Sequence, residues 1–87
     1  MAAVCFQGMS EYIATFFTHY GASQFARRLR QEGVRHRMMP VPRSLSSSCG
    51  TCVRFWAEDV QGYTQGEDLE GVYLVEGQQY RAIVVHE

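Results

Sequence analysis

The chain has 87 residues, of which 46% are hydrophobic and 20% charged, and its net charge is −1 at pH 7. This length predicts one small domain, and this balance excludes a disordered chain. No apolar run approaches the roughly 20 residues of a membrane helix, and no basic-then-apolar leader opens the chain. We therefore expect a cytoplasmic protein that contacts no membrane. The net charge gives no reason to expect a nucleic-acid partner.

The first residues are set apart from the rest of the chain. A second methionine, Met9, comes just before the first strand-like pattern. We interpret residues 1–9 as an N-terminal extension or a cloning remnant, and residues 10–87 as a single domain. Cys5 then counts as a bystander. The total of three cysteines is too small for a disulfide scaffold and favours a reducing compartment.

The first half of the domain predicts a strand and then a helix. Residues 11–18 are β-branched and aromatic, with apolar side chains on both alternating faces, which is typical of a central strand. Residues 19–32 are the clearest helix, with a cap at Thr18 and a stop at Gly33. Its apolar stripe has helical spacing and consists of Ala22, Phe25, Ala26 and Leu29.

The second half predicts mainly strands. Residues 34–39 alternate and are stopped by Pro40 and Pro42, because proline removes N–H donors. The next elements are a strand over 51–57, a short helix over 58–65, and strands over 71–76 and 79–85 joined by a turn at 76–78. The order β-α-β-β-(short α)-β-β predicts an α+β domain, a small ferredoxin-like (split β-α-β) sandwich with an added strand. The two-sided first strand indicates a homodimer or a covering C-terminal hairpin.

Charge is distributed unevenly along the chain. Six of the eight arginines lie between Arg27 and Arg43, and six of the nine acidic residues lie between Glu58 and Glu76. One interpretation is two solvated faces that attract each other. The other is a basic approach to the loop at 43–52. The interleaved aromatic residues of an RNA-binding sheet are not evident in this region.

The stretch "SLSSSCGTC", residues 44–52, contains the motif Cys49-Gly-Thr-Cys52. A thiol–disulfide pair is one interpretation, although the motif continues into a strand and not into a helix. A zinc site needs about four ligands, and the three histidines are scattered, so no metal is expected. A hydrolase needs a base and an orienting group, and only His36 lies on an element that leads towards the loop.

A fourth interpretation is a single nucleophilic thiol at Cys49. The hydroxyls of Ser46, Ser47 and Ser48 are donors, and Gly50 lets the backbone turn into an anion-binding nest. Arg43 and Arg54 flank the loop and would favour a thiolate, the reactive form. The alternative is a flexible serine-rich connection with an incidental cysteine. The residues alone leave these two interpretations open.

The segment "PVPRSLSSSCGTCVRF" follows "YIATFFT", a helix ending in Glu-Gly, and "VRHRMM". This pattern resembles the putative selenium/sulfur carrier protein-like family of small bacterial proteins, over roughly residues 10–75. The resemblance is strongest at Pro42, Arg43, Ser46, Ser47, Ser48, Cys49, Gly50 and Arg54, and "EGVYLV", residues 70–75, fits the closing strand.

The resemblance implies that Cys49 carries sulfur or selenium as a persulfide or selenopersulfide. It implies a cysteine desulfurase-like donor and an acceptor enzyme as partners, with no cofactor and no catalytic constellation in the chain itself. Cys52 departs from the family pattern, since this position is usually small or apolar, and a thiol there could act as a resolving partner. The region after residue 57 is shorter than the expected second helix. The alternatives are a thiol–disulfide redox protein using Cys49 and Cys52, and a non-catalytic interaction domain.

Overall fold

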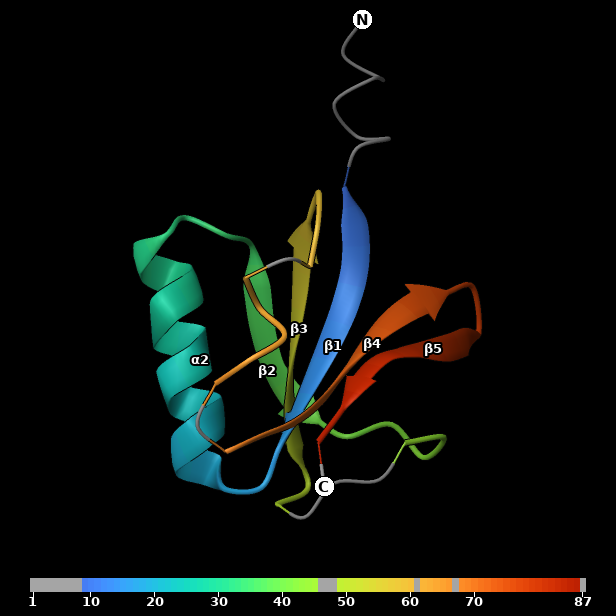
Figure 1. Cartoon of the computed structure of the whole chain (residues 1–87), viewed down its shortest axis with the longest axis horizontal. Coiled ribbons are helices and arrows are strands. Elements are labelled where there is room, and N and C mark those ends of the chain that lie inside the picture. Colours follow the sequence, from blue (N-terminus) through green and yellow to red (C-terminus); the bar gives the residue numbers. More distant parts are fainter. Residues whose placement is uncertain (1–8, 46–48, 61, 67, 87) are drawn as a thin grey trace, which may run out of the picture.

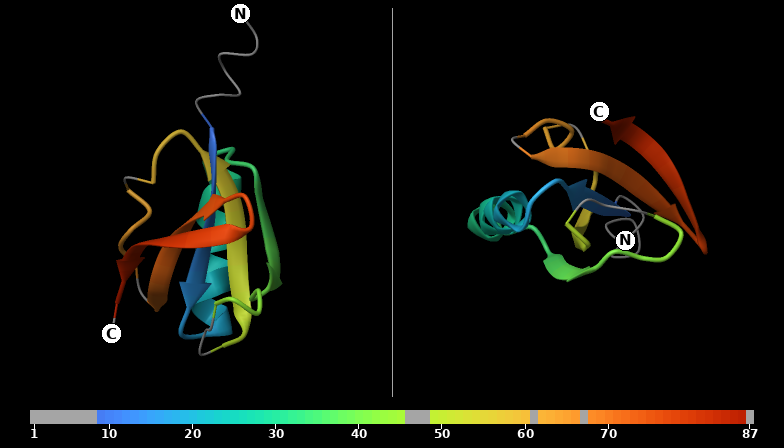
Figure 2. Two further views of the ribbon diagram at one scale, coloured as in Figure 1. Left: turned by 90° about the vertical axis from the view of Figure 1, so that its right-hand side faces the viewer. Right: turned by 90° about the horizontal axis from the view of Figure 1, so that it is seen from below.

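The computed structural model describes residues 9–45, 49–60, 62–66 and 68–86. The chain forms one antiparallel sheet with one helix packed on one of its faces (Figures 1 and 2). The elements in chain order are β1 (Ser10–Phe16), α2 (His19–Gln31), β2 (His36–Pro40), β3 (Thr51–Ala57), β4 (Leu69–Glu76) and β5 (Gln79–Val85). The strands predicted at 11–18, 34–39, 51–57, 71–76 and 79–85 are thus confirmed, with shifts of one or two residues at half of the strand ends.

The sheet has the strand order β2-β3-β1-β4-β5, and every neighbouring pair is antiparallel. The predicted α+β class is confirmed, but the ferredoxin-like sandwich is not, because the described residues form a five-stranded sheet with one helix and not two. Strand β1 is central, as its two-sided apolar pattern predicts. Ile13 and Ala14 point to opposite faces of the sheet and are both fully buried.

Helix α2 begins and ends where the sequence predicts. The Thr18 side chain accepts the Gly21 N–H at 3.0 Å, which satisfies one of the free donors of the first turn. Gly33, with φ +73, follows the helix in the left-handed conformation that glycine adopts without strain. Phe25 and Leu29 face the sheet and are buried. At 13 residues α2 is short, and no helix in the described residues is long and apolar enough to cross a membrane.

The core between α2 and the sheet is built largely from aromatic rings. Phe25 of the helix packs against Phe16 and Phe55, with ring centroids 5.2 and 5.5 Å apart, and Tyr12 stacks on Phe55 at 5.4 Å. Offset and edge-to-face pairs of this kind add to the free energy gained by burying the rings. Tyr63, from the segment between β3 and β4, completes the cluster, and its ring centroid lies 5.3 Å from that of Phe55.

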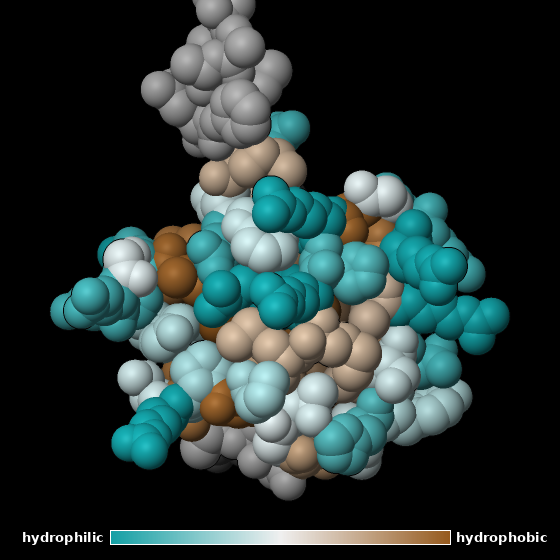
Figure 3. Space-filling view, turned by 180° about the vertical axis from the view of Figure 1, so that it is seen from behind, coloured by the Kyte–Doolittle hydropathy of each residue, from teal (hydrophilic) through white to brown (hydrophobic). Residues whose placement is uncertain are grey.

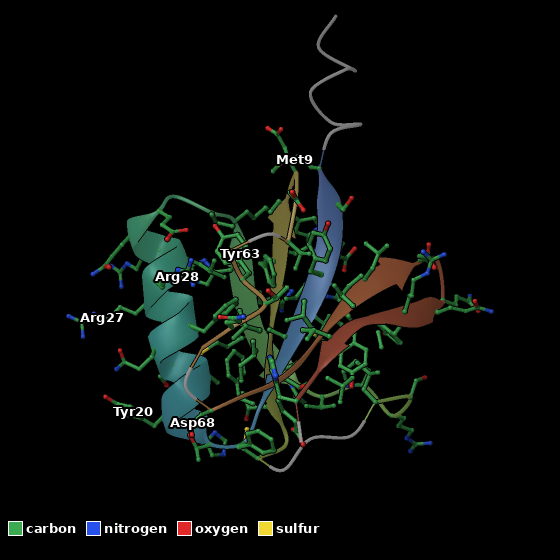
Figure 4. All side chains as sticks on the ribbon, viewed as in Figure 1. Met9, Tyr20, Arg27, Arg28, Tyr63 and Asp68 are labelled. Carbon is green, nitrogen blue, oxygen red and sulfur yellow. The ribbon has the colours of Figure 1, made fainter. Side chains whose placement is uncertain are left out.

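The prediction of a short helix over 58–65 is wrong, because the described residues between β3 and β4 form turns and irregular backbone. Gly62 has φ +92, which a right-handed helix does not allow. Instead Arg28 of α2 holds the segment. Its guanidinium donates to the Gly62 carbonyl at 2.7 Å and lies 4.8 Å from the centre of the Tyr63 ring (Figure 4).

Glu32 completes this contact. It accepts from the Tyr63 hydroxyl at 2.6 Å and pairs with Arg28 at 3.0 Å. These hydrogen bonds lower the pKa of the Glu32 carboxyl, the Tyr63 bond first, and the same bond raises the pKa of the Tyr63 phenol. Arg28 thus pairs with Glu32, the residue that caps its own helix.

Residues 41–45, which follow the edge strand β2, run along part of the sheet face opposite α2 towards the β4–β5 hairpin (Figure 2). Leu45 and Tyr80 of this region line the same depression. Ile13 on this face has no exposed surface within the single chain. A partner subunit is therefore not required to bury the second side of β1, and the homodimer stays a prediction.

Candidate functional site

Cys49 lies at the end of the loop that joins β2 to β3. The ends of this loop are tied together by a hydrogen bond from the Val41 N–H to the Gly50 carbonyl at 3.1 Å. Gly50 has φ +75, and no atom lies within 4 Å of the position that a Cβ would occupy. Glycine is required there by the backbone conformation and not by space. Cys49 is thus held immediately before a fixed turn that leads into β3.

The Cys49 thiol is free and partly exposed. Its Sγ–H donates to the Thr51 carbonyl at 3.4 Å, and the side chain packs against the edge of the core on the helix side of the sheet. Such a weak hydrogen bond is easily given up, so the thiol can turn towards a partner without disturbing the fold.

His19 approaches the same point from α2, of which it is the first residue. Its Nδ1 lies 3.2 Å from the Thr51 hydroxyl, so the start of the helix contacts the residue whose carbonyl accepts from Cys49. The N-terminal end of a helix favours negative charge nearby. A role for His19 at this point was not predicted, because the three histidines are scattered along the chain. The only signal was its place directly after the Thr18 cap.

Cys52 has a different environment from Cys49. It lies inside β3 with no exposed surface, paired across the sheet with Thr15 of β1 and Met39 of β2. Its Sγ–H points to the Pro40 carbonyl at 3.7 Å. Burial raises the pKa of the Cys52 thiol to about 11, while the charge of Arg54 lowers it and that of Cys49 raises it. The Cys52 thiolate is therefore rare at neutral pH.

The two thiols of the C-x-x-C motif are both free in this structure. Cys52 faces away from the helix, whereas Cys49 packs on the helix side, as expected for residues three apart at the start of a strand. The role of Cys52 as a resolving thiol stays a prediction. Its full burial and raised pKa favour a packing role, which is what the small or apolar residue expected at this position would have.

The other predicted site residues differ in where the structure places them. Arg43 is exposed. Arg54 points to the face opposite α2, where its Nε lies 2.9 Å from a Glu11 carboxylate oxygen. Ser46, Ser47 and Ser48 lie outside the described residues. That these serines and the two arginines stabilise a Cys49 thiolate stays a prediction, and Arg54 acts on the pKa of Cys52 instead.

A groove of about 220 Å³ lies elsewhere, between α2 and the segment before β4. Tyr20 and Asp68 lie at its lower end (Figure 4). A Cβ on Gly21 would come within 2.5 Å of the Asp68 Cβ, so glycine allows the segment to approach the helix. Cys49 does not line this groove. No group of three or more metal-binding side chains is formed by the residues that the structure describes.

Comparison with known proteins gives one family. Residues 11–72 match the family described as putative Se/S carrier protein-like, and the match includes β1, α2, β2, the Cys49 loop and β3. No match was found among curated proteins or among solved structures. The match covers well over half of the chain and includes both thiols of the C-x-x-C motif. The chain therefore belongs to the putative Se/S carrier protein-like family.

Proposed function

We propose that this protein carries sulfur or selenium as a persulfide or selenopersulfide on Cys49. The observation that carries the proposal is the difference between the two described thiols. Cys49 is partly exposed at the end of a loop, whereas Cys52 is fully buried with a raised pKa. The family description supports the same function. A carrier needs a thiol that both a donor and an acceptor can reach, and Cys49 meets this requirement.

The proposed loading step is a thiolate attack on a donor persulfide. The Cys49 sulfur attacks the outer sulfur of the donor, a new S–S bond forms, and the donor's inner sulfur leaves as a thiolate with the electron pair of the broken bond. Unloading is the same step with an acceptor nucleophile. No external oxidant or reductant takes part, and selenium in the outer position obeys the same balance.

The proposed partners are a cysteine desulfurase-like donor and an acceptor enzyme. In this scheme the partners supply the acid and base groups, so the carrier itself is not an enzyme and needs no cofactor. The half-exposed position of Cys49 and its weak hydrogen bond to Thr51 support this division, because the thiol must leave its resting contact to enter a partner's active site.

The test is intact-mass measurement of the reduced protein after incubation with a cysteine desulfurase and either cysteine or selenocysteine, so that the enzyme itself forms the donor persulfide or selenopersulfide. All samples carry Cys5→Ser, because Cys5 lies outside the described residues. We expect the mass to increase by one sulfur or selenium atom, to increase equally in Cys52→Ser, and to stay unchanged in Cys49→Ser.

A thiol–disulfide protein would give a different result. If no sulfur or selenium adduct forms, and mild oxidation instead removes two hydrogens in a reaction that needs both Cys49 and Cys52, the carrier function is contradicted. Unfolding of a variant is excluded as a cause by recording its circular dichroism spectrum beside that of the parent.

A further inference from the structure

Three arginines and a tryptophan form a compact block on the sheet face opposite α2. Arg37 of β2 and Arg54 of β3 are direct cross-strand partners. Arg35 lies one step further along, where its carbonyl accepts the Trp56 N–H at 3.1 Å and its guanidinium lies 4.6 Å from the centre of the Trp56 ring. Because alternate residues of a strand share a face, these four side chains project from the same side. We call them the basic block.

The pair formed by Arg37 and Arg54 is only partly neutralised, whereas Arg35 and Trp56 line a depression together with Glu58 and Asp59. Arg37 and Arg54 are like charges directly opposite each other, an arrangement that destabilises a sheet. Among the described residues Glu11 offsets this pair, with a carboxylate oxygen 2.9 Å from the Arg54 Nε. That Nε–H has no aligned acceptor among the described residues, so the contact is an ion pair without a good hydrogen bond. Arg35 and Arg37 form no ion pair with a described residue.

The position of the basic block suits an extended ligand. β2 is an edge of the sheet, and both Arg35 and Arg37 are exposed. Figure 3 views the molecule from the back of Figure 1 and shows strongly hydrophilic side chains beside moderately hydrophobic ones. Residues two apart in an extended chain are about 7 Å apart, so carboxylates at alternating positions of a bound segment would match Arg35 and Arg37 in spacing.

Nucleic acid fits the basic block less well than an acidic polypeptide. A base needs a free aromatic face to stack on, but the Arg35 guanidinium covers the Trp56 ring. The next aromatic residue on this face is Tyr73 of β4, beyond the buried Ile13 of β1. Carboxylates, by contrast, form charge-assisted hydrogen bonds with arginine in the forked geometry of its guanidinium.

We propose that the basic block is a docking site for an extended acidic segment of a partner protein, with alternate carboxylates on Arg35 and Arg37. The segment would neutralise Arg35 and Arg37, which are exposed and form no ion pair with a described residue. Arg35 and Arg37 are not among the residues predicted to stabilise a Cys49 thiolate, so the site can be tested without the thiol. Resting on the proposed function, the site would hold a partner while Cys49 exchanges sulfur with it.

Trp56 makes the test direct, since it is the single tryptophan of the chain and lies inside the basic block. The probe is a 12-residue peptide of alternating glutamate and serine, added at low and at physiological salt to protein carrying Cys49→Ser. We expect a saturable change in Trp56 emission that weakens with salt. Arg37→Glu should weaken binding about tenfold or more, and Arg37→Gln less. Both substitutions leave the Arg35–Trp56 contact in place.

The matched control is Arg27→Glu, which makes the same charge change on the outer side of α2, where Arg27 points into solvent (Figure 4). We expect this variant to bind within about twofold of the parent. Stability gives a second readout. Arg37→Glu puts an opposite charge beside Arg54, so its melting temperature should equal or exceed that of the parent. A merely structural arginine would show the reverse.

Three results would overturn the proposal. The first is equal weakening by Arg27→Glu and Arg37→Glu, which would indicate non-specific charge attraction. The second is tighter binding of a single-stranded oligouridylate of matched charge through Arg37, which would make the ligand a nucleic acid. The third is full displacement of the peptide by millimolar inorganic phosphate, which would indicate a small-anion site. Because the protein carries Cys49→Ser, none of these results depends on sulfur transfer.

Discussion

Two thiols three residues apart in the chain have opposite chemical settings. Cys49 ends a loop and is partly exposed, whereas Cys52 belongs to a central region of the sheet and has no exposed surface. Between them Gly50 turns the backbone with φ +75 and β3 begins. The boundary between loop and strand therefore decides which thiol a partner can reach. In this chain the two sulfurs of the C-x-x-C motif lie on opposite sides of that boundary.

The largest expected effect is in the native reactivity of the two thiols. A pKa of about 11 leaves about one Cys52 in ten thousand as thiolate at pH 7, and burial blocks the reagent as well. In protein carrying Cys5→Ser, we expect iodoacetamide to modify Cys49 at least about a hundredfold faster than Cys52. Peptide mass spectrometry over a time course measures both rates. Equal rates in the native protein would contradict the difference between the two thiols. Equal rates in urea, where the chain is unfolded, are the expected control result.

The second prediction concerns stability, where substitution of Cys52 should have a larger effect than substitution of Cys49. Cys52→Ala leaves a cavity between Thr15 and Met39 and should cost about 1.5–2 kcal/mol of unfolding free energy. Cys49→Ala, at a partly exposed position, should cost about 0.5 kcal/mol or less. Urea denaturation followed by circular dichroism compares them. A larger loss from Cys49→Ala would mean that the loop thiol is part of the core.

The turn between the two thiols is the next point to test. Gly50→Ala should cost about 1 kcal/mol, because its φ of +75 is unfavourable for any residue with a Cβ. Gly66→Ala is the matched control. Gly66 has no positive φ, and the nearest atom to its added Cβ is 4.0 Å away. The same urea titration serves both variants, and equal losses would argue against a conformational requirement at Gly50.

The smallest effect concerns pH and the contact between Tyr63 and Glu32, far from either thiol. Because the pKa of Glu32 is lowered on folding, its contribution is present above the ordinary carboxyl pKa and lost as pH falls through the folded value. Because the pKa of Tyr63 is raised, its contribution is present below the ordinary phenol pKa and lost as pH rises through the folded value.

Tyr63→Phe should therefore lower the melting temperature slightly at neutral pH and flatten its decline towards both acid and alkaline pH. Tyr80→Phe is the control, since the Tyr80 hydroxyl forms no hydrogen bond with the described residues of the chain. Parallel pH profiles for the parent and Tyr63→Phe would show that this contact contributes nothing. The rate of Cys49 modification should not change in either variant.

Much of the fold can be predicted from local pattern. The alternation of Val53 and Phe55 with Cys52 and Arg54 predicts both the strand at 51–57 and the opposite directions of its side chains. The segment after residue 57 could not be predicted, because Tyr63 is held by Glu32, 31 residues earlier in the chain. Local signals, such as Glu58 and Asp59 at the expected helix start, carry no information about that distant contact.

The candidate site, too, can be predicted from the sequence only in part. The place of Cys49 at the end of a loop can be predicted from the serine-rich run before it and from Gly50 after it. The approach of His19 to Thr51 could not, because it depends on how the β1–α2 turn meets the start of β3 across the sheet. The basic block likewise depends on the β2–β3 register, which places Arg37 opposite Arg54.

The most direct test of the central claim is to locate the transferred atom in a chain that keeps both described thiols. Protein carrying Cys5→Ser is loaded by a cysteine desulfurase with cysteine, alkylated under native conditions, digested and sequenced by mass spectrometry. We predict the added sulfur on Cys49 in nearly every loaded molecule, with Cys52 as a free thiol. Sulfur found mainly on Cys52, or a Cys49–Cys52 disulfide in place of any persulfide, would contradict the account.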